Sequence, residues 1–148
     1  MATYKSVTPS DIEILVQLMQ DFYAIDGYPM DAEQSKKLFS EFISNENLGK
    51  AWLIESGNDI VGYMILTFIF SFEYGGTIAF VDELYLTEKS RGKGIGKESI
   101  AFLQAEAAKL SLKLLYLEVE PHNLTAQKLY LSAGFSVHKR ELMRYKIE

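Results

Sequence analysis

The first third of the chain has apolar residues at helical spacing. Between Ile12 and Tyr23 they recur every three or four positions, which predicts an amphipathic helix. The preceding Thr8-Pro9-Ser10-Asp11 is typical of a helix start, with threonine as N-cap and proline in the first turn. A second helix is predicted from Asp31, and Thr3–Val7 is predicted to be a short edge strand.

The spacing changes to that of strands in the middle of the chain. Ala51–Glu55, Ile60–Phe72 and Thr77–Leu86 are rich in β-branched and aromatic residues. Glycine-containing turns separate them, so they are predicted to form an antiparallel meander.

The last third alternates between helical and strand patterns. Helices are predicted at Gly94–Leu110 and Asn123–Ala133, and strands at Lys113–Val119, Phe135–His138 and Met143–Ile147. A strand, a helix and a further strand within residues 77–119 suggest a parallel crossover. We therefore expect one domain, residues 1–148, of the α/β (α+β) class with a mixed sheet.

Composition narrows the possible chemistry. The 148 residues include no cysteine, which excludes disulfides, thiolate metal ligands and a cysteine nucleophile. The two histidines are 16 residues apart and have no metal-ligand spacing, so no metal is expected. The longest uncharged run has 13 residues, too short for a bilayer, and the N-terminus does not resemble a secretory leader. We expect a soluble, cytoplasmic protein with no membrane partner.

Charge is distributed unevenly along the chain. Residues 1–86 hold 4 basic and 13 acidic residues, whereas residues 87–148 hold 11 basic and 7 acidic ones. This pattern suits a protein that binds a cation with its first part and an anion with its second, although scatter over a solvated surface is the alternative. The overall charge of −5 argues against nucleic acid as the main partner.

The most informative segment is a glycine-rich turn at the predicted start of a helix. It reads Arg91-Gly92-Lys93-Gly94-Ile95-Gly96-Lys97. Backbone N–H groups at a helix N-terminus, together with these basic side chains, suit a phosphate or pyrophosphate. The segment does not match a P-loop, because Glu98 follows Gly96-Lys97, and it lacks the third glycine of a dinucleotide fingerprint. It does match the pattern R-x-x-G-x-G.

Two further motifs give this pattern a family. Asp82-Glu83-Leu84-Tyr85-Leu86 precedes the turn, and Asn123-x-x-Ala126-x-x-Leu129-Tyr130-x-x-x-Gly134-Phe135 follows about 30 residues later. Together the motifs strongly resemble the GNAT superfamily of acetyl-CoA-dependent N-acetyltransferases. The resemblance runs from about Trp52 to Phe135.

The resemblance implies a fold and a donor site. The fold is a mixed, mostly antiparallel central sheet with a splayed pair of parallel strands and helices on both faces. The donor is acetyl-CoA: its pantetheine arm would pair with the strand at Leu84, Tyr85 and Leu86, and its pyrophosphate would lie on the backbone of residues 91–97. Asn123 would hydrogen-bond the arm, and Tyr130 would lie near the thioester sulfur.

The chemistry needs an acid and a base. Since an alkyl ammonium has a pKa near ~10.4, it must lose a proton before it attacks, and the departing thiolate must gain one. By the resemblance, Tyr130 is the candidate acid, while Asp82 and Glu83 are candidate bases, directly or through water. A regular strand would point only one of these two carboxylates at the acceptor, unless a bulge intervenes.

The acceptor is predicted less directly. The Asp82-Glu83 pair resembles that of polyamine and aminoglycoside acetyltransferases, which favours a small or peptidyl cationic amine. Candidate acceptor contacts are Tyr23, Asp26, Tyr28 and Tyr74. The alternatives are a non-catalytic acyl-CoA-binding module and an enzyme that binds a nucleotide phosphate. A homodimer is expected by family analogy alone.

Overall fold

The three strands predicted in the middle of the chain form the centre of one sheet. The computed structural model describes residues 1–148 as two units, Met1–Glu118 and Val119–Glu148. In the first unit the strand order is β1-β2-β3-β4-β5, with bounds Ala2–Ser6, Gly49–Ser56, Asp59–Ser71, Gly76–Leu86 and Leu115–Tyr116. Neighbouring strands are antiparallel except β4 and β5, which are parallel. The mixed, mostly antiparallel sheet is thus confirmed.

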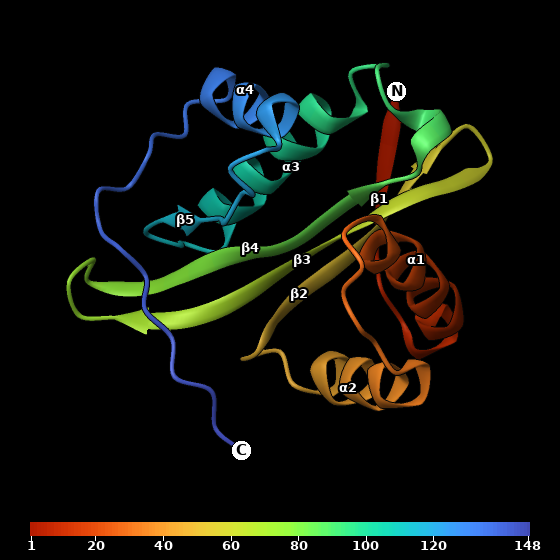
Figure 1. The fold of residues 1–148 in the computed structure, drawn as a ribbon, viewed down its shortest axis with the longest axis horizontal. Coiled ribbons are helices and arrows are strands. Elements are labelled where there is room, and N and C mark those ends of the chain that lie inside the picture. The colour runs from red at the N-terminus through yellow and green to blue at the C-terminus, as the bar shows by residue number, and fades with distance from the viewer. The chain divides into compact units, whose positions relative to one another are not determined.

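Helices cover both faces of this sheet. Helices α1 (Ile12–Ile25) and α2 (Ala32–Ser44) pack on one face, and α3 (Ile95–Lys109) packs on the other (Figure 1). The expected start signals are used: Pro9–Asp11 forms a 3-10 turn before α1, and the Asp31 side chain accepts hydrogen bonds from the N–H groups of Glu33 and Gln34.

Alternation along the strands produces two apolar cores, one on each face. Leu53, Tyr63 and Ile65 pack against α1 and α2. Their chain neighbours Trp52 and Met64 are 2% and 0% exposed on the face of α3, so both are core residues. The sheet is therefore buried on both sides over most of its length.

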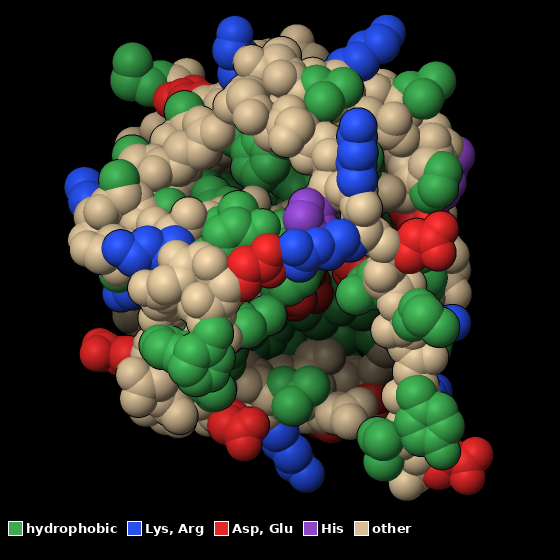
Figure 2. Space-filling view, turned by 90° about the vertical axis from the view of Figure 1, so that its left-hand side faces the viewer, with side chains coloured by type: hydrophobic (Ala, Val, Ile, Leu, Met, Phe, Trp, Pro, Cys, Tyr) green, Lys and Arg blue, Asp and Glu red, His purple; other side chains and the backbone are tan.

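The β3–β4 hairpin extends beyond these cores. At its end Phe70 is 67% and Phe72 92% exposed, and their rings pack edge to face. Figure 2 looks from the side that this hairpin occupies in Figure 1 and shows hydrophobic side chains on the surface among charged ones.

Three strand predictions differ from the structure. The predicted strand Lys113–Val119 is reduced to Leu115–Tyr116, and no strand follows it, so the strands predicted at 135–138 and 143–147 are wrong. Apolar residues do alternate in residues 135–138 and 143–147, as in a strand. A strand also needs a neighbouring strand for its backbone hydrogen bonds, and the alternation does not show whether one is present. Within the second unit only α4 (Leu124–Ser132) is regular.

None of the helices has the length and apolar content needed to cross a bilayer.

Candidate active site

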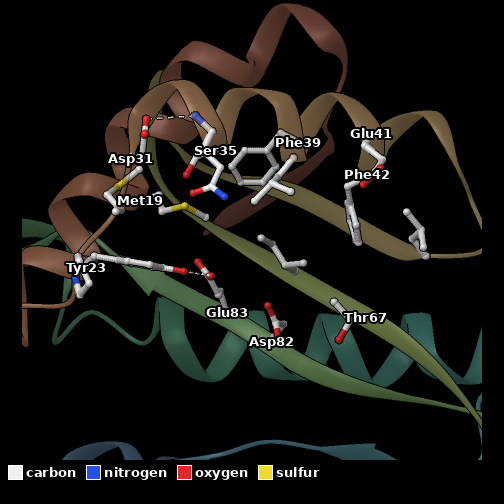
Figure 3. Close-up of a pocket in the computed structure, with 16 residues that line it drawn as sticks. Met19, Tyr23, Asp31, Ser35, Phe39, Glu41, Phe42, Thr67, Asp82 and Glu83 are labelled. Carbon is white, nitrogen blue, oxygen red and sulfur yellow. Dashed lines mark hydrogen bonds between the residues drawn. The ribbon is translucent and has the colours of Figure 1, made fainter. Parts of the chain in front are cut away.

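A bulge in β4 brings two neighbouring carboxylates to one pocket. Across from β4, Ile65 pairs with Glu83 and Leu66 pairs with Val81, so Asp82 has no residue opposite it. Such an extra residue bends the strand and changes the direction of its side chains. As a result Asp82 and Glu83 both line the pocket (Figure 3), although adjacent residues of a regular strand would face opposite sides.

The pocket lies between the helical layer of α1 and α2 and the strands β3 and β4. Its volume is about 420 Å³. Its charged lining residues are all acidic, namely Asp31, Glu41, Asp82 and Glu83. The rest of the wall is mainly apolar, with Met19, Pro29, Met30, Leu38, Phe39, Phe42, Leu48 and Ile65. A ligand that fits this lining carries positive charge on a partly apolar body.

Glu83 is held by two tyrosine hydroxyls. Tyr63 in β3 donates to Oε1 at 2.5 Å, and Tyr23 in α1 donates to Oε2 at 2.6 Å. Burial raises the pKa of Glu83; the two hydroxyls oppose that rise, and the neighbouring Asp82 adds to it. Both tyrosines have pKa values raised by burial and by Glu83, so they remain protonated donors.

Asp82 differs from Glu83 in its surroundings. Its side chain is exposed to the pocket and accepts no hydrogen bond from the first unit. Its pKa is raised, first by burial of the carboxylate and then by the charge of Glu118. Its oxygens are therefore available to a ligand that donates hydrogen bonds.

Beyond the two carboxylates, β4 has an open edge. Its pairing with β5 is limited to Ala79 with Leu115 and Phe80 with Tyr116. From Val81 to Leu86 the edge of β4 that faces away from β3 therefore has no neighbouring strand. Leu84, Tyr85 and Leu86, the predicted arm-binding residues, lie on this stretch, where an extended ligand can add to the edge.

The glycine-rich turn leads from this edge into α3. Gly92 and Gly94 have φ angles of 75° and 82°, in the left-handed region that favours glycine, and Gly94 is the N-cap of α3. The first N–H groups of a helix have no intrahelical acceptor, and here they belong to Ile95, Gly96 and Lys97. This geometry suits the predicted anion site.

Basic residues at the turn divide into two kinds. Arg91 stabilises the turn itself: its Nε donates to the Leu86 carbonyl at 3.0 Å, its guanidinium lies 5.9 Å from the Tyr85 ring centre, and its backbone N–H donates to Glu88. Lys93 and Lys97 are exposed. Of the predicted anion-binding backbone groups, that of Arg91 is thus already used within the protein.

The second unit holds the remaining predicted donor residues. Asn123 is the N-cap of α4, where its Oδ1 accepts from the Ala126 N–H at 3.1 Å, which leaves its two amide hydrogens for another acceptor. Tyr130 lies in α4 with its ring 5.8 Å from that of Phe135. Burial raises the pKa of Tyr130, so its phenol keeps its proton at neutral pH.

Of the predicted acceptor contacts, Tyr23 lines the pocket. Asp26 is the C-cap of α1, and Tyr28 is about half exposed with its ring 6.5 Å from that of Tyr23. Tyr74 accepts a hydrogen bond from the Tyr116 hydroxyl at 3.2 Å, near the β3–β4 turn. These last three are not among the lining residues of the pocket.

Sequence reasoning missed Tyr63 and the contribution of α2. Tyr63 is an apolar-pattern position of a long strand, and nothing in the sequence marks its hydroxyl as a partner of Glu83. The pocket residues of α2 do follow a pattern, since Gln34, Leu38 and Glu41 recur at helical spacing. The spacing predicts that these residues share one helix face, but it does not predict that this face borders a cavity.

Comparisons with known proteins agree with this geometry. Residues 13–135 match the family described as Acetyltransferase (GNAT) family. A D-amino-acid N-acetyltransferase of Saccharomyces cerevisiae is 25% identical over 140 residues, which cover 91% of this chain and 85% of the relative.

Solved structures show the same fold. An integron cassette protein from a salt-marsh metagenome has a TM-score of 0.88 and 30% identity, covering 98% of this chain and 90% of the other. A predicted acetyltransferase of Clostridium acetobutylicum, solved with acetyl-CoA, has a TM-score of 0.81 and 20% identity, covering 98% and 96%.

These matches define the class of enzyme, an acyl-CoA-dependent N-acetyltransferase. The chain belongs to the acetyltransferase (GNAT) family.

Proposed function

We propose that this protein transfers the acetyl group of acetyl-CoA directly to a primary amine of a small or peptidyl, cationic acceptor bound in the pocket. The observation that carries the proposal is the bulge that turns both Asp82 and Glu83 into a pocket without any basic lining residue. Carboxylates arranged in this way attract an ammonium group and can then accept its proton.

Acetyl-CoA is the proposed donor, and the open edge of β4 and the glycine turn support this role. The pantetheine arm would pair along Leu84–Leu86, and the diphosphate would accept hydrogen bonds from the N–H groups at the start of α3. The acetyl-CoA in the Clostridium acetobutylicum relative is further support. Lys93 and Lys97 would add favourable charge.

The proposed reaction is a direct transfer. Glu83, directly or through water, accepts a proton from the acceptor ammonium, and the neutral amine nitrogen then attacks the thioester carbonyl carbon. The new C–N bond forms, the nitrogen loses a second proton, and the C–S bond breaks. Tyr130 donates its proton to the departing thiolate of CoA and regains one, directly or through water, from the nitrogen that becomes the amide. With no cysteine in the chain, an acyl-cysteine intermediate is impossible.

Glu83 is favoured over Asp82 as the base for a physical reason. Burial raises the pKa of both carboxylates, which suits a general base, so the pKa does not distinguish them. Glu83 is the more buried of the two, and Tyr23 and Tyr63 hold it in one orientation. Asp82, which is open to the pocket, is better placed to bind the acceptor's positive charge.

An amino-acid acceptor is the second candidate, because the yeast relative is named for D-amino acids. The pocket lining favours the cationic amine instead. The carboxylate of an amino acid would meet four acidic side chains and no basic one.

A thiol-release assay with acetyl-CoA tests the proposal. The panel contains polyamines, aminoglycosides, lysine peptides, and D- and L-amino acids at equal concentration. We expect CoA release with cationic amines and little with amino acids. CoA release with amino acids alone would reverse the acceptor assignment. The absence of CoA release with every amine of the panel would contradict the proposal.

Donor use is tested separately. CoA is expected to raise the melting temperature in a saturable way, and ATP and NAD are not. Tyr130→Phe should lower kcat while the affinity for acetyl-CoA stays unchanged; a module that only binds acyl-CoA has no turnover to lose.

A further inference from the structure

The two hydroxyls on Glu83 come from different elements and meet different oxygens of one carboxylate. Tyr63 reaches Oε1 from β3, and Tyr23 reaches Oε2 from α1 (Figure 3 draws the bond from Tyr23). Distances of 2.5 and 2.6 Å are those of hydroxyl donors to an ionised carboxylate. The arrangement therefore fits Glu83 as an anion.

The rings that carry these hydroxyls are firmly packed. Tyr63 is 0% exposed. Phe22 packs edge to face on both Tyr63 and Tyr23, and it stacks on Tyr85 with ring centres 5.1 Å apart. The hydroxyls consequently have little freedom to follow a moving carboxylate, and they fix its direction instead.

Without these donors the surroundings of Glu83 favour its neutral form. The groups that act on it from the packed elements are Tyr23, Tyr63 and Asp82, and the pocket adds the carboxylates of Asp31 and Glu41. None of them is a cation. Burial and acidic neighbours both disfavour a second negative charge, and the two hydroxyls are the opposing influence.

We propose that Tyr23 and Tyr63 are positioning residues that keep Glu83 deprotonated and aimed into the pocket. The proposal deepens the proposed function, because it rests on Glu83 as the base. The tyrosines do not exchange the proton themselves. They lower the pH at which Glu83 becomes available, and they set the acid limb of the pH profile.

The test compares Tyr63→Phe and Tyr23→Phe with the wild-type enzyme and with Tyr4→Phe. The control removes a hydroxyl that contacts Ser99 on the opposite face of the sheet. Tyr63→Phe is the cleaner variant because Tyr63 is not a pocket-lining residue, whereas Tyr23 is. Thermal unfolding of each variant shows which are folded, and Tyr23→Phe takes the place of Tyr63→Phe if the latter does not fold.

In Tyr63→Phe and in Tyr23→Phe we expect the acid limb of the kcat/KM profile to move to higher pH by about one unit, as for the loss of one hydrogen bond to a charged group. In Tyr63→Phe the loss of kcat/KM should be clearly larger at low pH than at high pH, where only the aim of Glu83 is affected, and the KM for acetyl-CoA should change little. The profile of Tyr4→Phe should match that of the wild type. A loss of activity that is equal at every pH would overturn the proposal, since it indicates a structural role alone.

A measurement independent of activity separates this proposal from the proposed function. The carboxyl 13C signal of Glu83, assigned by its loss in Glu83→Gln, is followed against pH. A higher pKa in Tyr63→Phe supports the proposal, and an unchanged pKa overturns it. If the pKa rises while the acid limb stays in place, the tyrosines do control Glu83, and it is the assignment of Glu83 as base that fails.

Discussion

The proposed acceptor pocket and the glycine-rich turn are close in the chain, because the turn follows the strand that holds Asp82 and Glu83, but they are built to bind their ligands by opposite means. The pocket uses side chains from α1, α2, β3 and β4, and its central hydrogen bond joins residues 60 positions apart. The turn would instead use backbone N–H groups of three consecutive residues at the start of α3, Ile95, Gly96 and Lys97. Binding by backbone groups suits a ligand that all members of a family share, because it depends little on side-chain identity. Binding by side chains suits a ligand that varies between members, because side chains can be substituted one by one.

The largest expected effect comes from replacing the proposed base, Glu83. Glu83→Gln keeps the shape of the side chain and a hydrogen-bond acceptor but cannot take up a proton. We expect kcat to fall by about 10²- to 10⁴-fold, the usual contribution of general acid–base catalysis. Steady-state kinetics measures the loss, and CoA binding should stay unchanged by calorimetry; a variant with near wild-type kcat would rule out Glu83 as the base.

A matched pair of glycine substitutions tests the backbone side. Gly94 and Gly57 have φ angles of 82° and 63°, and in both cases an added Cβ meets nothing within 4 Å. Valine at either position carries a similar backbone strain, on the order of 1–2 kcal/mol. We expect Gly94→Val to weaken CoA binding about tenfold by calorimetry and Gly57→Val to leave it unchanged. Equal losses of CoA affinity in both variants would mean that backbone strain at any position weakens binding, and that the glycine-rich turn has no special role.

Asp82→Asn separates the two carboxylates of the pocket. Because Asp82 is open to the pocket and Glu83 is engaged by tyrosines, we expect the amide to raise the KM for a cationic acceptor about fivefold with a smaller change in kcat. Initial-rate kinetics with a cationic and a neutral amine measures this. A kcat loss as large as that of Glu83→Gln would assign the base to Asp82.

The smallest expected effect belongs to the exposed charges of the turn. Lys97→Gln should weaken CoA binding about threefold at low salt, as typical for exposed charge pairs, and the difference should vanish at high salt. Lys109→Gln, at the other end of α3, is the control and should have no effect. A salt-independent loss in Lys97→Gln would indicate that the residue shapes the turn instead of attracting the diphosphate.

Much of the fold was predictable because its signals are local. The helix of Ile12–Ile25, the meander and the helix after Gly94 follow from periodicity, caps and turn residues that act within a few positions. The C-terminal strands were wrong because the same periodicity does not tell whether a backbone partner exists. The division into two units leaves the one-domain expectation for residues 1–148 a prediction.

Site residues divide in the same way. Asp82, Glu83, Gly92 and Gly94 were predicted as a motif, and the possibility of a bulge was recognised. Tyr63 was not predicted, since its hydroxyl becomes a donor only when the neighbouring strand brings a carboxylate within reach, here from Glu83, which pairs with Ile65. The roles assigned to these residues, and to Asn123 and Tyr130, stay predictions.

The amino-acid sequence by itself determined the meander, the glycine-initiated helix and the family of this protein, because each depends on residues that are close in the chain. Only the tertiary structure decided that both carboxylates share one pocket, and that two tyrosines bind the more buried of them. The physical reason is that the pairing register of β3 and β4 creates the bulge, and register is a relation between strands that no single segment contains.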